Sequence, residues 1–164
     1  MDATSIIDPT KSQLETVIRW LKKEHLNELH GSSGFYCNRS IIRKPYRHSQ
    51  MKCLMTGHLI VGFAIFSLDT TYSAIDILEI RPAYRGNGYG RLFATQMINF
   101  LFSGGAPYVA VECSPITSEP FWRNLGFVDE EKKYSSWENP KLILRPKEDE
   151  RGQGRFVMRN CLVL

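Results

Sequence analysis

The chain has 164 residues, of which 43% are hydrophobic and 23% charged, and it carries a net charge of +4. This length lies near the usual size of one domain and can bury a sizeable core, so we expect residues 1–164 to form a single domain. The composition is ordinary for a soluble globular protein. No apolar run approaches the ~20 residues that a membrane helix needs, so no membrane helix is expected.

The N-terminus and the cysteines indicate a cytoplasmic protein. The opening segment MDATSIID has neither the basic region nor the apolar region of a secretory signal peptide. The cysteines are far apart and form no CxxC pair: Cys37, Cys53, Cys113 and Cys161. We therefore expect reduced thiols and no metal site.

The first third of the chain predicts a strand, a helix and a loop. Ser5–Ile7 is a candidate for a short first strand. Asp8 is predicted to be the N-cap of a helix and Pro9 its first residue, and the helix is expected to end at Gly31. One face of this helix carries Leu14, Val17, Ile18, Leu21 and His25. The segment between Gly31 and Met51 is expected to be a loop.

Three strands are predicted next. Met51–Met55 and Leu59–Leu68 form a hairpin around Thr56-Gly57-His58, because a glycine turn separates two apolar runs. Tyr72–Ile80 is expected to pair with them after the turn at Asp69-Thr70-Thr71. These strands would lie at the centre of a sheet.

The second half predicts two units of strand and helix, followed by a β-rich tail. A helix follows Gly90, with Phe93, Met97 and Leu101 on one stripe. The pair Gly104-Gly105 separates it from a short buried strand at Tyr108–Cys113. The polar segment 145–154 is expected to be a hairpin loop.

The stretch from Ile75 to Gly90, IDILEIRPAYRGNGYG, points to a phosphate-bearing ligand. Here an apolar strand runs into a glycine-rich turn and then a helix. Glycines let backbone N–H groups approach an anion, and the helix N-terminus adds a partial positive charge. A Walker loop would need Lys and Ser or Thr after Gly90, where Arg91 and Leu92 stand. A Rossmann fingerprint would start at the strand end, which Pro82 separates from the glycines.

Two blocks in the chain resemble motifs of the GNAT acyl-CoA N-acyltransferase superfamily. The spacing Arg85-x-x-Gly88-x-Gly90, preceded by hydrophobic-x-Pro, resembles its motif A, and SEPFWRNLGF at Ser118–Phe127 resembles its motif B. The resemblance implies an α/β (α+β) fold with a mixed, mostly antiparallel central sheet that splays in the middle, flanked by helices. It also implies an acetyl-CoA-dependent N-acetyltransferase that passes acetyl directly to a primary amine of an unidentified acceptor.

The resemblance further assigns the contacts of acetyl-CoA. The backbone of Leu78 would face the thioester carbonyl, and that of Ile80 would bond the pantetheine amide. Five consecutive amides would cradle the pyrophosphate: those of Gly86, Asn87, Gly88, Tyr89 and Gly90. Arg85 would add a charge-assisted contact to a phosphate. Phe121 and Trp122 would pack on the core and line the pantetheine tunnel.

The candidate catalytic bases are carboxylates. Glu79 ranks first and Glu112 second, and Asp76 is a third candidate on the opposite face of its strand from Glu79. A carboxylate in so apolar a strand would be poorly solvated, which would raise its pKa toward the working range of a base. The alternative is a carboxylate paired with Arg81 or another nearby cation, and a water chain could also serve as the base.

The sequence does not identify the residue that would protonate the departing thiolate. In many family members a tyrosine on the motif B helix protonates the departing thiolate, and the corresponding position here is Trp122. An indole N–H is not a useful acid. Either Tyr134 or Tyr89 serves instead, or the thiolate leaves without help.

The positive charge is concentrated in one segment. Five basic residues and no Asp or Glu lie between Leu29 and Leu68: Arg39, Arg43, Lys44, Arg47 and Lys52. One interpretation is a solvated loop. The other is a positive rim, from residues 39 to 52, that attracts the cofactor or RNA, with Tyr36, Tyr46 and His48 suited to stacking on bases.

Two further functions stay open. A non-catalytic acyl-CoA binding or sensing module would explain the tryptophan at the tyrosine position. An aminoacyl-tRNA- or RNA-directed protein would use the glycine loop for RNA phosphates, and its binding would depend steeply on salt. The expected assembly is a monomer or a homodimer.

Overall fold

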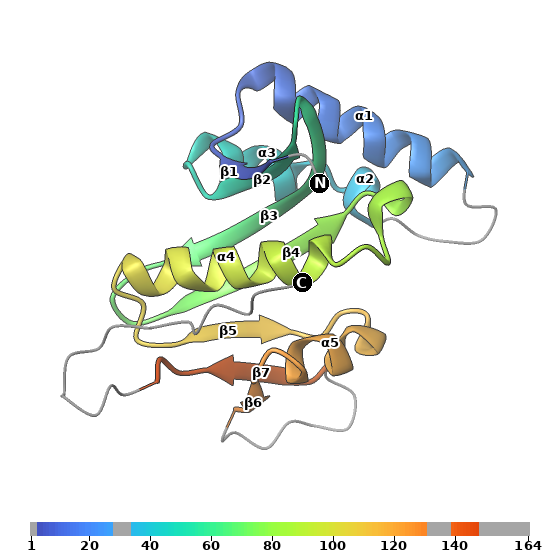
Figure 1. The fold of residues 1–164 in the computed structure, drawn as a ribbon. Helices are drawn as coiled ribbons and strands as arrows, with labels where there is room; N and C mark the ends of the chain where they lie inside the picture. The colour runs from blue at the N-terminus through green and yellow to red at the C-terminus, as the bar shows by residue number, and fades with distance from the viewer. Residues whose placement is uncertain (1–2, 28–33, 131–138, 148–164) are drawn as a thin grey trace. The chain divides into compact units, whose positions relative to one another are not determined.

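The structure is a computed structural model that describes residues 3–27, 34–130 and 139–147 (Figure 1). The chain divides into two compact units, which are described separately. The first contains Met1–Ser67 and Ile75–Met97, and the second contains Leu68–Ala74 and Ile98–Leu164. The expectation of a single domain stays a prediction.

Seven strands are hydrogen-bonded in the order β1-β2-β3-β4-β5-β7-β6. Their bounds are β1 Thr4–Ile7, β2 Met51–Thr56, β3 Leu59–Leu68, β4 Ser73–Ile80, β5 Val109–Glu112, β6 Val128–Asp129 and β7 Lys141–Leu144. The pairs β1–β2, β2–β3, β5–β7 and β6–β7 are antiparallel, and β4–β5 is parallel, with Ala74 opposite Ala110. The mixed, mostly antiparallel sheet expected from the sequence is confirmed. Its splay stays a prediction.

The helices are α1 Lys11–Asn27, α2 Gly34–Cys37, α3 Ser40–Arg47, α4 Tyr89–Ser103 and α5 Glu119–Arg123, with short 3₁₀ turns η1 Pro82–Tyr84 and η2 Ile116–Ser118. The predicted helix after Gly90 corresponds to α4. Its predicted stripe is buried, because Phe93, Met97 and Leu101 are each 0% exposed. No described helix is both long and apolar enough to span a membrane.

The N-cap of α1 is Thr10 and not Asp8. The Thr10 hydroxyl accepts a hydrogen bond from the Gln13 amide (3.3 Å), and the Gln13 side chain accepts one from the Thr10 amide (2.8 Å). This reciprocal pair is a capping box, which satisfies two amides at once. Asp8 instead accepts an ion-pair contact from Lys52 at 2.7 Å. The expected stop at Gly31 lies outside the described residues.

The apolar face of α1 packs on the strands of the first unit. Its buried residues are Leu14, Val17, Ile18, Trp20 and Leu21. Trp20 makes an edge contact with Phe63 of β3, with ring centroids 5.5 Å apart. Each fully buried large apolar side chain contributes about 1.5–3 kcal/mol to stability. This core holds α1 against β2 and β3.

The expected loop between α1 and β2 contains two helices, so that prediction is wrong. The apolar face of α3 explains its position, because Ile42 is 0% exposed and Ile41 and Tyr46 pack against the same core. Figure 1 shows α3 beside β2. Pro45 lies inside this helix. A proline there lacks the N–H of a regular turn, which is why the segment looks unhelical in sequence.

The turns around β3 and β4 form as predicted. Thr56 lies opposite Leu59, and Gly57 between them has φ 53°. The Asp69 side chain accepts hydrogen bonds from the amides of Thr71 and Tyr72, at 2.7 and 2.6 Å. Such a side-chain turn reverses the chain before β4.

In the second unit, β5 begins after the break at Gly104-Gly105, where Gly105 has φ 90°. Val109 and Val111 of β5 are buried, and β5 pairs with β7 from Val109 to Glu112. The β-rich tail is thus present in β6 and β7, while most of the expected hairpin loop at 145–154 lies outside the described residues.

Candidate functional site

The glycine-rich turn begins where β4 and β3 are in close contact. A Cβ placed on Gly62 of β3 would lie 2.8 Å from the Glu79 carbonyl oxygen and 2.7 Å from the Ile80 side chain. Only glycine permits this approach. The Arg81 amide then donates to the Val61 carbonyl at 2.8 Å, and Pro82 ends the pairing. The end of β4 is therefore held in a defined position.

The Arg85 side chain folds back over the end of β4. Its Nε donates to the Ile80 carbonyl at 2.8 Å, and its Nη2 contacts the Glu79 carboxylate at 2.6 Å. These contacts join the start of the glycine turn to the strand it leaves. The structure thus pairs two predicted site residues with each other: the first-ranked base and the predicted phosphate ligand.

Two glycines give the turn its shape. Gly86 has φ 79° and Gly88 has φ 80°, a left-handed conformation that costs other residues about 1–2 kcal/mol. A Cβ at either position would meet nothing within 4 Å, so the surroundings of both are open. The Asn87 side chain donates to the Arg85 carbonyl at 3.1 Å and braces the turn from within.

Five successive amides at this turn have no partner. Among the residues that the structure describes, the N–H groups of Gly86, Asn87, Gly88, Tyr89 and Gly90 donate to no acceptor. Leu92 donates to the Gly88 carbonyl at 3.0 Å, which starts the regular bonding of α4. Unpaired amides at and just before the N-terminus of a 15-residue helix are groups suited to an anion, and we call these five amides the amide cradle. These residues therefore fit a phosphate-bearing cofactor.

The two acidic residues of β4 have different environments. Glu79 is 25% exposed in its side chain and pairs with Arg85. Asp76 accepts a hydrogen bond from the Ser67 hydroxyl at 2.8 Å. Desolvation by the surrounding chain raises the pKa of the Asp76 carboxyl, although the side chain keeps contact with solvent. The Ser67 contact only partly offsets this.

The other predicted site residues lie in the second unit. Glu112, at the end of β5, is exposed and accepts a hydrogen bond from the Asn139 side chain at 3.0 Å. Trp122 is 6% exposed and packs edge-on between Phe121 and Phe127, with ring centroids 5.0 and 5.3 Å away. Core packing of Trp122 is therefore observed, while its role toward a cofactor stays a prediction.

Two buried thiols of the described chain, Cys53 and Cys113, are not activated. Cys37, Cys53 and Cys113 are free thiols, and Cys161 lies outside the described residues. Burial raises the pKa of Cys53 to about 12. Burial, with the nearby charge of Glu119, also raises the pKa of Cys113. Both thiols stay protonated near neutral pH and are poor nucleophiles.

Sequence reasoning missed the contact between Glu79 and Arg85. It named Arg81 or another nearby cation as the possible partner, without singling out Arg85. The available signal was the turn at Pro82–Tyr84, which can reverse the chain and return Arg85 to the strand end. The contact of Ser67 with Asp76 was also missed, and follows from the pairing of β3 and β4.

Comparison with known proteins identifies the family. A family model described as Acetyltransferase (GNAT) family matches residues 14–127. The chain belongs to the GNAT acetyltransferase family. The match covers β4, the glycine turn, the start of α4 and the motif B block, so the resemblance inferred from the sequence is confirmed. No curated protein matches this GNAT chain in sequence.

Solved structures share the fold at low identity. An acetyltransferase of the GNAT family from Staphylococcus aureus Mu50 is 18% identical, covers 88% of this chain and 100% of its own, and gives a TM-score of 0.66. PaiA N-acetyltransferase from Thermoplasma acidophilum, solved with coenzyme A, is 15% identical, with coverages of 87% and 99% and a TM-score of 0.64. N-acetylglutamate synthase from Neisseria gonorrhoeae, solved with coenzyme A and N-acetyl-glutamate, is 13% identical, with a TM-score of 0.66. The match covers 88% of this chain and 35% of the synthase chain.

Proposed function

We propose that this GNAT protein transfers an acetyl group from acetyl-CoA directly to a primary amine of an acceptor. The observation that carries the proposal is the cradle of five unpartnered amides between Gly86 and Gly90, at the start of α4. Membership of the family supports the reaction type. We also propose that the reaction takes place in the cytoplasm, because the free thiols suit a reducing compartment.

The residues of the first unit would bind the cofactor mainly through the backbone. The amides from Gly86 to Gly90 would receive the pyrophosphate, and the backbone of Leu78 and Ile80 would meet the thioester and pantetheine groups. The Ile80 carbonyl already accepts from Arg85, so its N–H is the better candidate for that contact. When bound, acetyl-CoA supplies an acetyl thioester. Phe121 and Trp122 are proposed to line the pantetheine arm.

The base must take a proton from the attacking amine. We propose Glu79 first and Glu112 second. In the structure, Oε1 of Glu79 is engaged by Arg85, so this contact would have to loosen as Glu79 accepts a proton. Asp76, whose raised pKa suits a base, is the third candidate. A water between base and amine would serve any of the three.

Departure of the thiolate is proposed to need no dedicated acid. Trp122 is buried and offers only an indole N–H. The Tyr89 ring packs edge-on against Tyr84, with centroids 6.0 Å apart, which ties it to the turn. Tyr134 lies outside the described residues. A thiolate is a good leaving group, so the missing acid does not argue against turnover.

The test is calorimetry of acetyl-CoA binding with two matched glycine variants. Gly88 and Gly105 both have positive φ (80° and 90°), and both have open space where a Cβ would go. The changes Gly88→Ala and Gly105→Ala therefore introduce similar backbone strain, about 1–2 kcal/mol each. Only Gly88→Ala disturbs the amide cradle. We expect it to weaken acetyl-CoA binding by about tenfold or more, since 1.4 kcal/mol corresponds to a factor of ten.

Three results would contradict the proposal or replace it. If wild type does not bind acetyl-CoA, the acetyltransferase function is wrong. If both variants weaken binding equally while thermal melting shows both folded, the cradle is not the site. If wild type binds tightly but acetylates no amine in a panel of polyamines, amino acids, peptides and aminoacyl-tRNA, the chain is a non-catalytic acyl-CoA binding module.

A further inference from the structure

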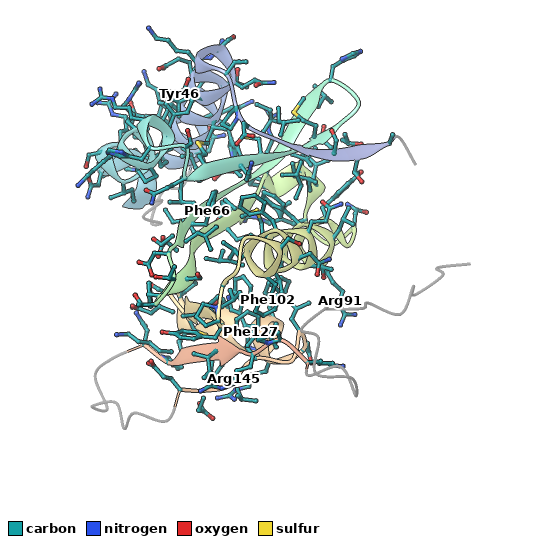
Figure 2. All side chains as sticks on the ribbon, turned by 90° about the vertical axis from the view of Figure 1, so that its left-hand side faces the viewer. Tyr46, Phe66, Arg91, Phe102, Phe127 and Arg145 are labelled. Atoms are coloured by element: carbon teal, nitrogen blue, oxygen red, sulfur yellow. The ribbon has the colours of Figure 1, made fainter. Side chains whose placement is uncertain are left out.

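The exposed face of α3 forms a basic hollow, and none of the residues assigned to acetyl transfer lines it. This hollow, of about 350 Å³, is lined by Arg39, Ser40, Arg43, Lys44 and Arg47, and we call it the α3 hollow. Four of its five lining residues carry positive charge. Figure 2 shows nitrogen-tipped side chains gathered around the helix that carries Tyr46. The basic residues that the sequence left as either a solvated loop or a positive rim therefore lie on and beside a helix.

The fold fixes the direction in which these side chains point. Ile42 and Tyr46 are four residues apart and hold the inner face of α3 on the core. Arg39, Arg43 and Arg47 are also spaced by four residues and occupy another face. At 1.5 Å per residue, neighbouring arginines start about 6 Å apart along the helix. The α3 hollow is thus a short row of cations on a supported helix.

Among the described residues, one acidic side chain pairs with the cations of the α3 hollow. Glu15 of α1 pairs with Arg43 through two contacts, at 2.7 and 3.1 Å. Within the described ranges, no acidic side chain forms an ion pair with Arg39, Lys44 or Arg47. Like charges one helical turn apart repel and destabilise a helix. A bound anion would relieve this repulsion.

The lining of the α3 hollow favours phosphates over other anionic partners. It contains no apolar side chain. Protein partners usually bind through a buried apolar or aromatic anchor, and a helix that lies on a membrane also buries an apolar face, which in α3 is already packed on the core. Arginine forks and a hydroxyl are the groups that bind phosphates well.

The aromatic residues indicate how a strand would be bound. The Tyr36 ring already contacts His25, with centroids 5.5 Å apart, and lies 5.3 Å from the Arg39 guanidinium. It therefore supports Arg39, and its stacking on bases stays a prediction. A second hollow, of about 280 Å³, shares Arg47 and is lined by Tyr46. Asp8, which is paired with Lys52, also lines this second hollow, so we expect the phosphates of a strand to bind in the α3 hollow.

We propose that the α3 hollow binds single-stranded nucleic acid through its phosphate backbone, without sequence preference. This function does not depend on acetyl-CoA. Three unpaired cations would contact about three phosphates. For single strands, the slope of the logarithm of the binding constant against the logarithm of the salt concentration is about −0.7 per phosphate contact. Three contacts therefore give an expected slope of about −2.

The experiment measures fluorescence anisotropy of a labelled oligouridine over a series of KCl concentrations, without acetyl-CoA. The variant Lys44→Gln/Arg47→Gln removes two cations of the α3 hollow. The control Lys22→Gln/Lys23→Gln removes two exposed cations of α1 and gives the same net charge. We expect the first variant to reduce the slope to about −0.7 and the control to keep it near −2. Acetyl-CoA binding should be unchanged in both, which also shows that they fold.

The opposite results would overturn the proposal. Equal loss of affinity in both variants would mean that the oligonucleotide senses only net charge. Displacement of the oligonucleotide by polyglutamate as effectively as by unlabelled oligouridine would indicate an acidic peptide partner instead. Absence of binding by wild type at low salt would exclude the site, whatever the outcome with acetyl-CoA.

Discussion

The glycine turn and the α3 hollow are both suited to anions, but they offer different groups. The turn presents backbone amides from Gly86 to Gly90, which carry no net charge and have fixed directions. The α3 hollow presents long charged side chains. Backbone donors select an anion by geometry, whereas exposed cations attract it at a distance and lose strength in salt. The turn therefore suits one specific ligand, and the hollow suits a repeating polyanion.

Both regions also contain an arginine held by a glutamate. Arg85 contacts Glu79 at 2.6 Å, and Arg43 contacts Glu15 at 2.7 Å. Charge alone is thus a poor guide to anion sites, because each region contains an arginine that is already paired. The groups that remain for an anion differ between the two regions: they are backbone amides in the turn and three cationic side chains in the α3 hollow. Removing each glutamate tests what its arginine does.

The largest effect is expected from Glu79→Gln. If Glu79 is the base, its loss lowers kcat by about 10²–10⁴-fold, the usual contribution of general base catalysis. The acetyl-CoA Kd should change little, because the amide cradle is intact. Steady-state kinetics and calorimetry measure the two quantities, with Glu112→Gln as the matched carboxylate control. A weakened Kd with preserved kcat would show instead that Glu79 serves to hold Arg85.

A smaller effect, confined to one of the two regions, is expected from Gly62→Ala. The added Cβ would press on the Glu79 carbonyl and the Ile80 side chain, at 2.8 and 2.7 Å. We expect a loss of about 1–3 kcal/mol of unfolding free energy, as for overpacking in a core. Acetyl-CoA binding should weaken because the strand end moves, while the salt slope for oligouridine should not change.

A control for Gly62→Ala is Gly104→Ala. There the added Cβ would lie 2.7 Å from the Leu68 side chain, whose flexible end can move aside. Gly104→Ala should therefore cost less stability and leave acetyl-CoA binding intact. Equal effects of the two variants on acetyl-CoA binding would contradict a special role for the end of β4.

The parts of the fold that follow local patterns were predictable. The hairpin from Met51 to Leu68 and the stripe of α4 follow from hydrophobic periodicity and turn glycines. The N-cap of α1 was mistaken because Asp8-Pro9 is a stronger single signal than Thr10. The pair Thr10 and Gln13, three residues apart, was nevertheless a readable capping box.

The contacts that decide chemistry were less predictable. Motif spacing located the glycine turn. It did not predict that the Arg85 side chain returns to the end of β4, because that contact depends on how the turn at Pro82 directs the chain. The helix α3 was hidden by Pro45 and by its dense charge. Pairing of Arg43 with Glu15 joins residues 28 positions apart. No local sequence rule predicts a contact between residues so far apart, and this one forms because α3 packs near α1.

The smallest effect is expected from Glu15→Gln, which leaves the glycine turn untouched. This change releases Arg43 from its partner and adds a fourth cation to the α3 hollow. We expect tighter binding of oligouridine and a salt slope steeper by about 0.7, the share of one phosphate contact. Lys22→Gln/Glu15→Gln, in which net charge is restored, should keep the steeper slope. A slope equal to that of wild type would mean that Arg43 does not reach the strand.

Glu15→Gln should also change the thermal stability of the protein in a pH-dependent way, because the ion pair of Glu15 with Arg43 is lost. The hydrogen bond from Arg43 lowers the pKa of Glu15 below its usual value of 4.5. A carboxyl with a lowered pKa stabilises the fold above its usual pKa, and this contribution is lost as the pH falls through the lowered value. Wild type should therefore melt slightly above Glu15→Gln at neutral pH, and the difference should vanish in acid. Because Glu15 is exposed, solvent keeps this difference small. A gain in oligouridine binding without this pH-dependent loss would show that Arg43 is not held by Glu15 in solution.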